Sequence, residues 1–223
     1  PIDSLRENKV MSLKTKFGNL GNILDFNNLT KENIYVLDSP ILSNAQFEKF
    51  SNFFNKNSTL IDCTFDEKED LESSILRIQK EAEIAARKGI IHLILSDKNM
   101  SDTRLAIPML ICVGSINSHL IKQKLRGYTS INVQTGEALD THSFATLLGV
   151  GATTVNPYLA LDSIYQRFEK KLFGKFDYEE CVVRYIKSIN SGLLKIMSKM
   201  GISVLSSYRG GSVSYSHLRA HET

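Results

Sequence analysis

The fold class is decided by one stretch of the sequence, IIHLILSD at residues 90–97. Its first six residues are isoleucine or leucine apart from His92, which is typical of a strand buried on both faces of a sheet. Two polar residues, Ser96 and Asp97, follow directly and mark the end of the strand. We therefore predict a central strand over residues 90–95.

Strand and helix patterns alternate on both sides of this stretch. The other predicted strands are residues 59–65, 130–134 and 153–156, the last broken by Pro157. The predicted helices are residues 71–86, closed by Gly89, 108–125, opened by Pro108, and 142–148, stopped by Gly149. This alternation predicts an α/β fold with a mainly parallel sheet, either open or bent toward a barrel.

An irregular entry segment, residues 1–58, precedes these units. It contains a loop dense in glycine and asparagine, and then a short helix that Ser43 or Asn44 caps. Four phenylalanines of this helix are expected to face inward: Phe47, Phe50, Phe53 and Phe54.

The α/β domain is assigned to residues 59–210, and its last third, residues 159–200, is predicted to be mostly helical. Gly174 and Asp177 indicate a break in it, and Gly192 a kink or boundary. Residues 212–223, SVSYSHLRAHET, have no hydrophobic period and resemble the translation of a sequencing-library adapter. We expect this tail not to belong to the fold, and we expect the chain, which begins at Pro1, to be a piece of a longer enzyme.

Composition excludes several function classes. Lysine and arginine number 27 against 24 acidic residues, and they are scattered, so we expect no nucleic-acid partner. No apolar run approaches the ~20 residues that a bilayer requires, so we expect no membrane role. The location expected for the chain is the cytoplasm, or a plastid in a plant or alga.

Histidines and cysteines are poorly placed for catalysis. His92 lies inside an apolar strand, His119 beside apolar residues of a helix and His142 at a helix start, so each is interpreted as a packing residue. The three cysteines, Cys63, Cys112 and Cys181, are odd in number and widely spaced. We interpret them as reduced thiols in the core, and we predict no metal site.

Polar residues at the predicted carboxyl ends of the strands form one candidate site. Asp97, Glu137 and Asn156 occupy the edge where α/β folds place active sites, and Asp97 and Glu137 could serve as an acid/base pair. The favoured interpretation is structural, because the sequence indicates no nucleophile or metal ligand nearby. Asp97 would then cap the following turn, and Glu137 would form a local salt bridge.

A second candidate site is the loop that contains Gly18, Asn19, Gly21 and Asn22. As a phosphate-binding loop it is a weak candidate, because no buried strand precedes it and no long helix follows it closely. Two interpretations stay open: a tight turn whose asparagines cap the backbone, and a loop that approaches the ligand of another domain.

Several segments in order resemble the central domain of the glutamate synthase large subunit, over about residues 5–210. The segments are residues 14–22 (KTKFGNLGN), 37–42 (LDSPIL), 94–97 (ILSD), 135–138 (TGEA), 155–160 (VNPYLA) and 192–203 (GLLKIMSKMGIS). Each is a weak signal alone, and the ordered set is specific.

This resemblance implies a role in making glutamate from glutamine and 2-oxoglutarate. In that family the central domain is similar in topology to the flavin domain, binds no flavin, and connects the amidotransferase site to the FMN site while helping to line the ammonia route. The resemblance places the loop at residues 18–22 toward that route. FMN and an iron–sulfur cluster are implied for the full-length enzyme, and no cofactor for this chain.

The implied partners are the amidotransferase and FMN domains of the same chain, with electrons from a small NAD(P)H-oxidising subunit or ferredoxin. By itself the chain is expected to be inactive. Two alternatives stay open: a non-catalytic regulatory or scaffold module, and an unrelated barrel enzyme that uses Asp97 and Glu137.

Overall fold

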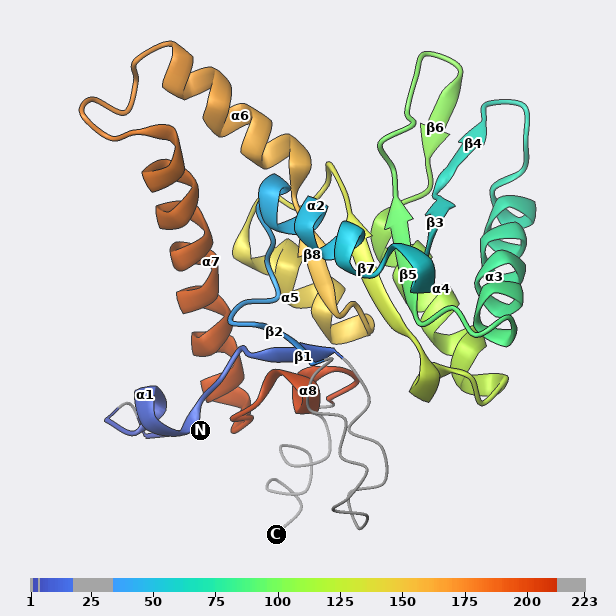
Figure 1. Ribbon diagram of the computed structural model, residues 1–223, viewed down its shortest axis with the longest axis horizontal. Coiled ribbons are helices and arrows are strands. Elements are labelled where there is room, and N and C mark those ends of the chain that lie inside the picture. The colour runs from blue at the N-terminus through green and yellow to red at the C-terminus, as the bar shows by residue number, and fades with distance from the viewer. Residues whose placement is uncertain (1, 4, 18–33, 212–223) are drawn as a thin grey trace, which may run out of the picture.

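The computed structural model describes residues 2–3, 5–17 and 34–211, with a four-stranded parallel sheet at its centre (Figure 1). The strands are β3 (Ser58–Asp62), β5 (His92–Ser96), β7 (Ser130–Gln134) and β8 (Thr154–Asn156). They lie side by side in their order along the chain, each parallel to the next. The predicted α/β class with a mainly parallel sheet is confirmed.

Three helices connect these strands: α3 (Leu71–Arg87), α4 (Met109–Lys122) and α5 (Thr141–Val150). Each strand is added to the sheet on the same side as the one before it. Because crossovers between parallel strands are right-handed, the three helices then all lie on one face of the sheet. The strand residues of that face are apolar and share one core with the helices: Ile61, Leu93, Leu95, Val133 and Val155. Sequential strands with helices on one face form a section of a barrel, as predicted.

Helix α3 begins and ends where the sequence predicts. The Asp70 carboxylate accepts a hydrogen bond of 3.0 Å from the Ser73 backbone N–H and so caps the first turn. Gly89 follows the last turn with a φ of 84°, a backbone geometry that glycine adopts without strain.

Helix α5 ends two residues later than predicted. The Asp140 side chain caps its start by accepting from the Ser143 N–H at 2.8 Å. Gly149 lies within the helix, and the chain turns at Gly151, whose φ is 131°. The prediction of a stop at Gly149 is wrong because the positive φ is needed at the turn into β8.

The predicted strand at residues 59–65 is divided in two. After β3, strand β4 (Thr64–Asp66) leaves the sheet and pairs antiparallel with β6 (Arg104–Ala106). Asp62 Oδ1 accepts from both the N–H of Thr64, at 3.0 Å, and its hydroxyl, at 2.7 Å, which turns the chain at Cys63. The pairing with β6 was not predicted because three residues are too few to show an alternating pattern.

The entry segment covers the other face of the sheet. It contains the antiparallel strands β1 (Thr15–Phe17) and β2 (Tyr35–Leu37), then helix α2 (Asn44–Phe53) and a 3-10 turn, η2 (Asn55–Asn57). The rings of Phe17, Phe50 and Phe54 surround His92 of β5, with centroids 3.9–5.7 Å from its ring. Aromatic side chains therefore fill the face that the helices leave open.

Helix α2 starts as predicted, and one of its phenylalanines does not face inward. Ser43 caps the helix in a reciprocal capping box with Gln46. Phe47 and Phe50 are buried, whereas Phe53 is 56% exposed. The prediction for Phe53 is wrong because residues 47, 50 and 54 share one helical face, and residue 53 projects from the next.

The last third of the chain forms a long helical hairpin, at the left of Figure 1. Helix α6 (Tyr158–Glu169) and helix α7 (Tyr178–Met200) are separated by the predicted break, where Gly174 has a φ of 62° and Asp177 caps α7. Helix α7 runs unbroken through Gly192, so the predicted boundary there is wrong. A Cβ on Gly192 would lie 2.5 Å from Thr141 Cγ2 of α5, and the glycine therefore permits close helix packing.

Short elements complete the described chain: α1 (Glu7–Val10), η3 (Arg126–Tyr128) and α8 (Leu205–Tyr208). A bridge between Ser12 and Val204 brings the first and last described segments together. Among the described helices, none combines the length and apolarity needed to cross a bilayer. The division into residues 1–58, 59–210 and 212–223 stays a prediction.

Candidate functional site at the carboxyl edge of the sheet

Asp97 and Glu137 both lie at the carboxyl edge, and each binds a different loop. Asp97 is fully buried, and its carboxylate accepts from the Thr135 hydroxyl at 2.5 Å and from the Gly136 N–H at 3.1 Å. It thereby caps the turn after β7. The structural role is as interpreted from the sequence, but the predicted turn, the one that directly follows Asp97, is wrong because the carboxylate points toward the neighbouring strand end. Glu137 accepts from the Met109 N–H at 3.0 Å, so it caps helix α4 rather than forming the predicted salt bridge.

A tyrosine lies beside the Asp97 carboxylate. Burial raises the pKa of Tyr158 to about 12, and the negative charge of Asp97 adds to this rise. A Cβ on Gly136 would lie 3.2 Å from the Tyr158 hydroxyl, so glycine makes room for the tyrosine above the turn. Tyr158 therefore stays protonated at neutral pH and can donate a hydrogen bond.

Polar side chains along the same edge bind one another. Ser96 donates to Gln134 Oε1 at 2.9 Å, and Gln134 Nε2 donates to Asn156 Oδ1 at 3.4 Å. Asn156 Nδ2 in turn donates to Asn44 Oδ1 and to the Leu42 carbonyl, both at 3.0 Å. These hydrogen bonds within the chain occupy polar groups that could otherwise bind a ligand at this edge.

The sequence predicted Asn156 at this edge and missed two of its partners. Gln134 is the last residue of β7, and its polar character after an apolar strand was an available signal. Either Ser43 or Asn44 was expected to cap helix α2, and Ser43 takes that position. The contact of Asn44 with Asn156 spans 112 positions of the chain, and no local pattern indicates such a contact.

His92 and His119 pack within the fold as expected. His92 is buried, with Nδ1 2.8 Å from the Ser130 hydroxyl, and burial lowers its pKa to about 4, so its ring is neutral at pH 7. His119 Nε2 lies 2.7 Å from Glu83 Oε2 between helices α4 and α3. The prediction is wrong for His142, because its position in the first turn of α5 faces solvent.

The cysteines are buried thiols without disulfides, as expected: Cys63, Cys112 and Cys181. Within residues 2–3, 5–17 and 34–211, no three histidine, cysteine or acidic side chains are grouped so that they could hold a metal ion.

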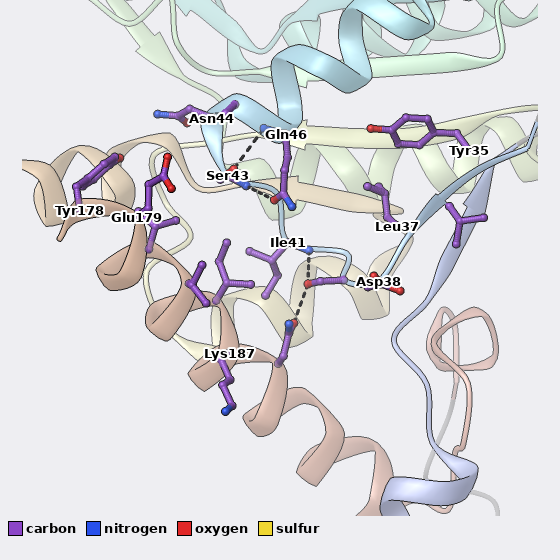
Figure 2. A pocket seen from close by; sticks show the side chains of 17 residues that line it. Tyr35, Leu37, Asp38, Ile41, Ser43, Asn44, Gln46, Tyr178, Glu179 and Lys187 are labelled. Atoms are coloured by element: carbon purple, nitrogen blue, oxygen red, sulfur yellow. Dashed lines mark hydrogen bonds between the residues drawn. The ribbon is translucent and has the colours of Figure 1, made fainter. Parts of the chain in front are cut away.

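A groove of about 810 Å³ lies between residues 35–46 and helix α7 (Figure 2). Its lining is mainly apolar and includes Leu37, Ile41, Val182 and Ile186. At one end the Ser39 hydroxyl donates to Asn190 Oδ1 at 2.8 Å, which joins the two sides. The groove was not predicted, because its sides are far apart in the sequence.

The predicted loop site, with Gly18, Asn19, Gly21 and Asn22, lies outside the described residues. The strands on either side of it are described. Phe17, the last residue of β1, pairs with Tyr35, the first residue of β2. The connection that holds these four residues therefore begins and ends beside the aromatic cluster on the sheet.

Comparison with known proteins decides the family. The glutamate synthase central domain model matches residues 1–215. This chain belongs to that family. The glutamate synthase [NADPH] large chain of Azospirillum brasilense is 50% identical over 214 residues, which are 95% of this chain and 14% of that protein.

Other glutamate synthases match over a similar extent. The large chain of Bacillus subtilis is 41% identical over 96% of this chain, and the chloroplastic ferredoxin-dependent enzyme of Spinacia oleracea is 39% identical over 95%. This glutamate synthase central domain spans 14% of the length of each relative.

Solved structures resemble the chain more distantly. A flavocytochrome b2 mutant with pyruvate bound matches with a TM-score of 0.46 and 14% identity, covering 66% of this chain and 38% of that one. A structure of DHODH in complex with ferulenol from Eimeria tenella matches with a TM-score of 0.43 and 15% identity, covering 68% of this chain and 37% of that one.

Proposed function

We propose that this chain is the connecting domain of a glutamate synthase large chain. It links a glutamine amidotransferase site to an FMN site and helps to line the route that ammonia takes between them. Family membership supports this role. The observation that carries it is that the chain's own side chains occupy the open face and the carboxyl edge of the sheet. Phenylalanine rings fill the face that the helices leave open, and the polar groups of the carboxyl edge bind one another.

The described residues do not fit the cofactors of the whole enzyme. A flavin requires a cleft with donors for its phosphate, whereas Phe17, Phe50 and Phe54 occupy the open face of this sheet. An iron–sulfur cluster requires several grouped cysteine thiolates. Cys63 and Cys112 are neighbours, but in the part that the structure describes no group of three possible metal ligands occurs. We therefore assign both cofactors, and the reduction step, to other domains.

The groove along α7 supports a connecting role. Val36 and Val183 line it and are 49% and 62% exposed, so apolar side chains face outward on both sides. An apolar surface of this kind usually packs against another protein surface. Most of the length of the relatives lies outside this chain, and the natural occupant of the groove is a neighbouring domain of the same large chain.

In the proposed ammonia route, Asn19 is the residue of this chain that faces the migrating molecule. A neutral amide can donate to ammonia and accept from it without protonating it, whereas a carboxylic acid would trap it as ammonium.

We propose that the whole enzyme lies in the cytoplasm, or in a plastid like the Spinacia relative that is named chloroplastic.

Replacement of Asn19 by leucine in the full-length enzyme tests this role. Glutamine hydrolysis should continue, glutamate formation from glutamine should fall, and formation from added ammonia should fall less. The matched control is Asn52→Leu, on the exposed side of helix α2, which should leave all three rates unchanged. If the Asn19 variant keeps hydrolysis and synthesis coupled at normal rates, residue 19 is a turn residue and the route does not pass this loop.

A further inference from the structure

Two partly buried arginines meet at the amino edge of the sheet, opposite the site described above. Arg126 follows helix α4 and donates from Nη2 to the Gly151 carbonyl at 2.8 Å. Arg209 follows helix α8 and donates from Nη1 to the Thr153 hydroxyl at 3.2 Å. Gly151 and Thr153 belong to the same short loop between α5 and β8, so the loop brings the two guanidinium groups together.

Both arginines bind neutral acceptors. The other bonds of Arg126 go to Asn117 Oδ1, at 2.6 Å, and to the Thr129 carbonyl, at 2.5 Å. Among the described residues, neither Arg126 nor Arg209 has a carboxylate within 4.0 Å. Five other arginines do have such a partner: Arg6, Arg77, Arg87, Arg104 and Arg184.

This arrangement is electrostatically unfavourable as it stands. Burial and, to a smaller extent, repulsion by Arg209 together lower the pKa of Arg126 to about 10. Burial also lowers the pKa of Arg209. Partly buried cations are normally paired with an anion, because neutral acceptors compensate a buried charge incompletely.

We propose that Arg126 and Arg209 together bind an oxyanion, either a carboxylate or a phosphate, at the amino edge of the sheet. A guanidinium group has five N–H donors in a planar fork. The described bonds use three donors of Arg126 and one of Arg209, which leaves donors on both forks for a ligand with several oxygens. This proposal does not depend on the connecting role proposed above.

The oxyanion can come from two sources. One is a free solute such as phosphate, and the other is the carboxylate of an aspartate or glutamate elsewhere in the long chain. Either source would neutralise the same pair of cations. The two sources differ in whether the site stays open to solutes when the rest of the large chain is present.

Thermal unfolding of the 223-residue chain tests the site, with sodium phosphate compared against sodium chloride at equal ionic strength. At a phosphate concentration about 100 times Kd, the midpoint should rise by about 5–10 °C. Arg209→Gln should abolish this rise. Arg184→Gln should keep it, because Arg184 lies on helix α7 and pairs there with Glu180.

The full-length large chain then identifies the source. If phosphate raises its midpoint as well, the ligand is a free solute. If phosphate has no effect while Arg209→Gln still lowers the midpoint, a carboxylate of the chain fills the site.

A second variant is available if Arg209→Gln does not fold. Arg209→Lys keeps the charge and loses the planar fork, so it should weaken phosphate binding measured by titration calorimetry. No phosphate-specific rise in the 223-residue chain, or a rise that Arg209→Gln and Arg184→Gln share, would overturn the proposal and leave the arginines as clamps on the loop.

Discussion

At the residue scale, Asp97 combines complete burial with a negative charge, and its hydrogen bonds explain how both are tolerated. Thr135 and Gly136 donate to the carboxylate from the turn after β7. Such charge-assisted bonds stabilise an ionised acid away from water. The same bonds make Asp97 a structural link between two strand ends, which argues against the acid/base pair with Glu137 that the sequence left open.

Replacement of Asp97 by alanine should therefore lower stability. The change leaves the Gly136 N–H and the Thr135 hydroxyl without their acceptor, at a cost of about 1–3 kcal/mol for each buried group left unsatisfied. Urea unfolding measures this loss. Asp102→Ala, in the exposed turn before β6, is the control and should change the free energy of unfolding by less than about 0.5 kcal/mol. Equal midpoints for the two variants would contradict the structural role.

His92 should give the protein a measurable pH dependence. Its pKa is about 4 in the folded chain against an ordinary value of 6.5, so the folded state favours the neutral ring. The stability that this preference contributes is complete above about pH 6.5 and is lost as pH falls toward 4, with a slope of up to about 1.4 kcal/mol per pH unit.

Unfolding measured between these pH values tests the expected slope. His92→Gln should reduce it, whereas His142→Gln, at an exposed position of α5, should keep it. A slope that His92→Gln leaves unchanged would show that another group titrates.

At the element scale, the contact between helices α5 and α7 depends on Gly192, a residue without a side chain. A Cβ on Gly192 would lie 2.5 Å from Cγ2 and 2.7 Å from Oγ1 of Thr141. The close approach lets the long helix α7 pack against the first turn of α5, with Leu193 and Met197 in the core. A single glycine thus sets the distance between two helices.

Gly192→Ala should destabilise the protein by about 1–3 kcal/mol, because the added methyl group forces the helices or Thr141 to move. The double variant with Thr141→Ala should recover most of the loss, and thermal or urea unfolding of the four chains gives the coupling energy. Gly114→Ala in helix α4 is the control. Its Cβ would meet nothing within 4 Å, so it should be neutral or stabilising. Additive losses at residues 192 and 141 would rule out the contact.

At the scale of the whole molecule, the sheet is covered on both faces by the chain itself. Helices α3, α4 and α5 cover one face, and the aromatic entry segment covers the other. A barrel-like section usually keeps its carboxyl edge for a ligand. Here Phe17, Phe50 and Phe54 cover the open face, and Asn44 binds Asn156 at the carboxyl edge.

The purified chain should therefore bind no FMN and form no glutamate. Absorbance in the flavin region after incubation with FMN, and equilibrium dialysis, measure binding directly. As a positive control, a full-length glutamate synthase large chain should retain FMN in the same procedure. Stoichiometric FMN on the 223-residue chain would contradict the connecting role.

The sequence by itself determined the elements of the sheet and the residues at its edge. The strand predicted at residues 90–95 and found at 92–96, the strand at 130–134, a cap at Ser43 or Asn44, and the positions of Asp97 and Glu137 follow from local patterns of burial, capping and charge. Such patterns are visible because they repeat within one helix turn or one strand.

Only the tertiary structure decided how these elements meet. Gly192 permits a close helix contact where the sequence indicates a boundary, Phe53 faces solvent, and Glu137 caps a helix 28 residues away. Asn44 joins the carboxyl edge, and Arg126 meets Arg209 across the loop before β8. The physical reason is that packing, caps and charge pairs between distant segments depend on distances in space, and a local sequence pattern carries no information about them.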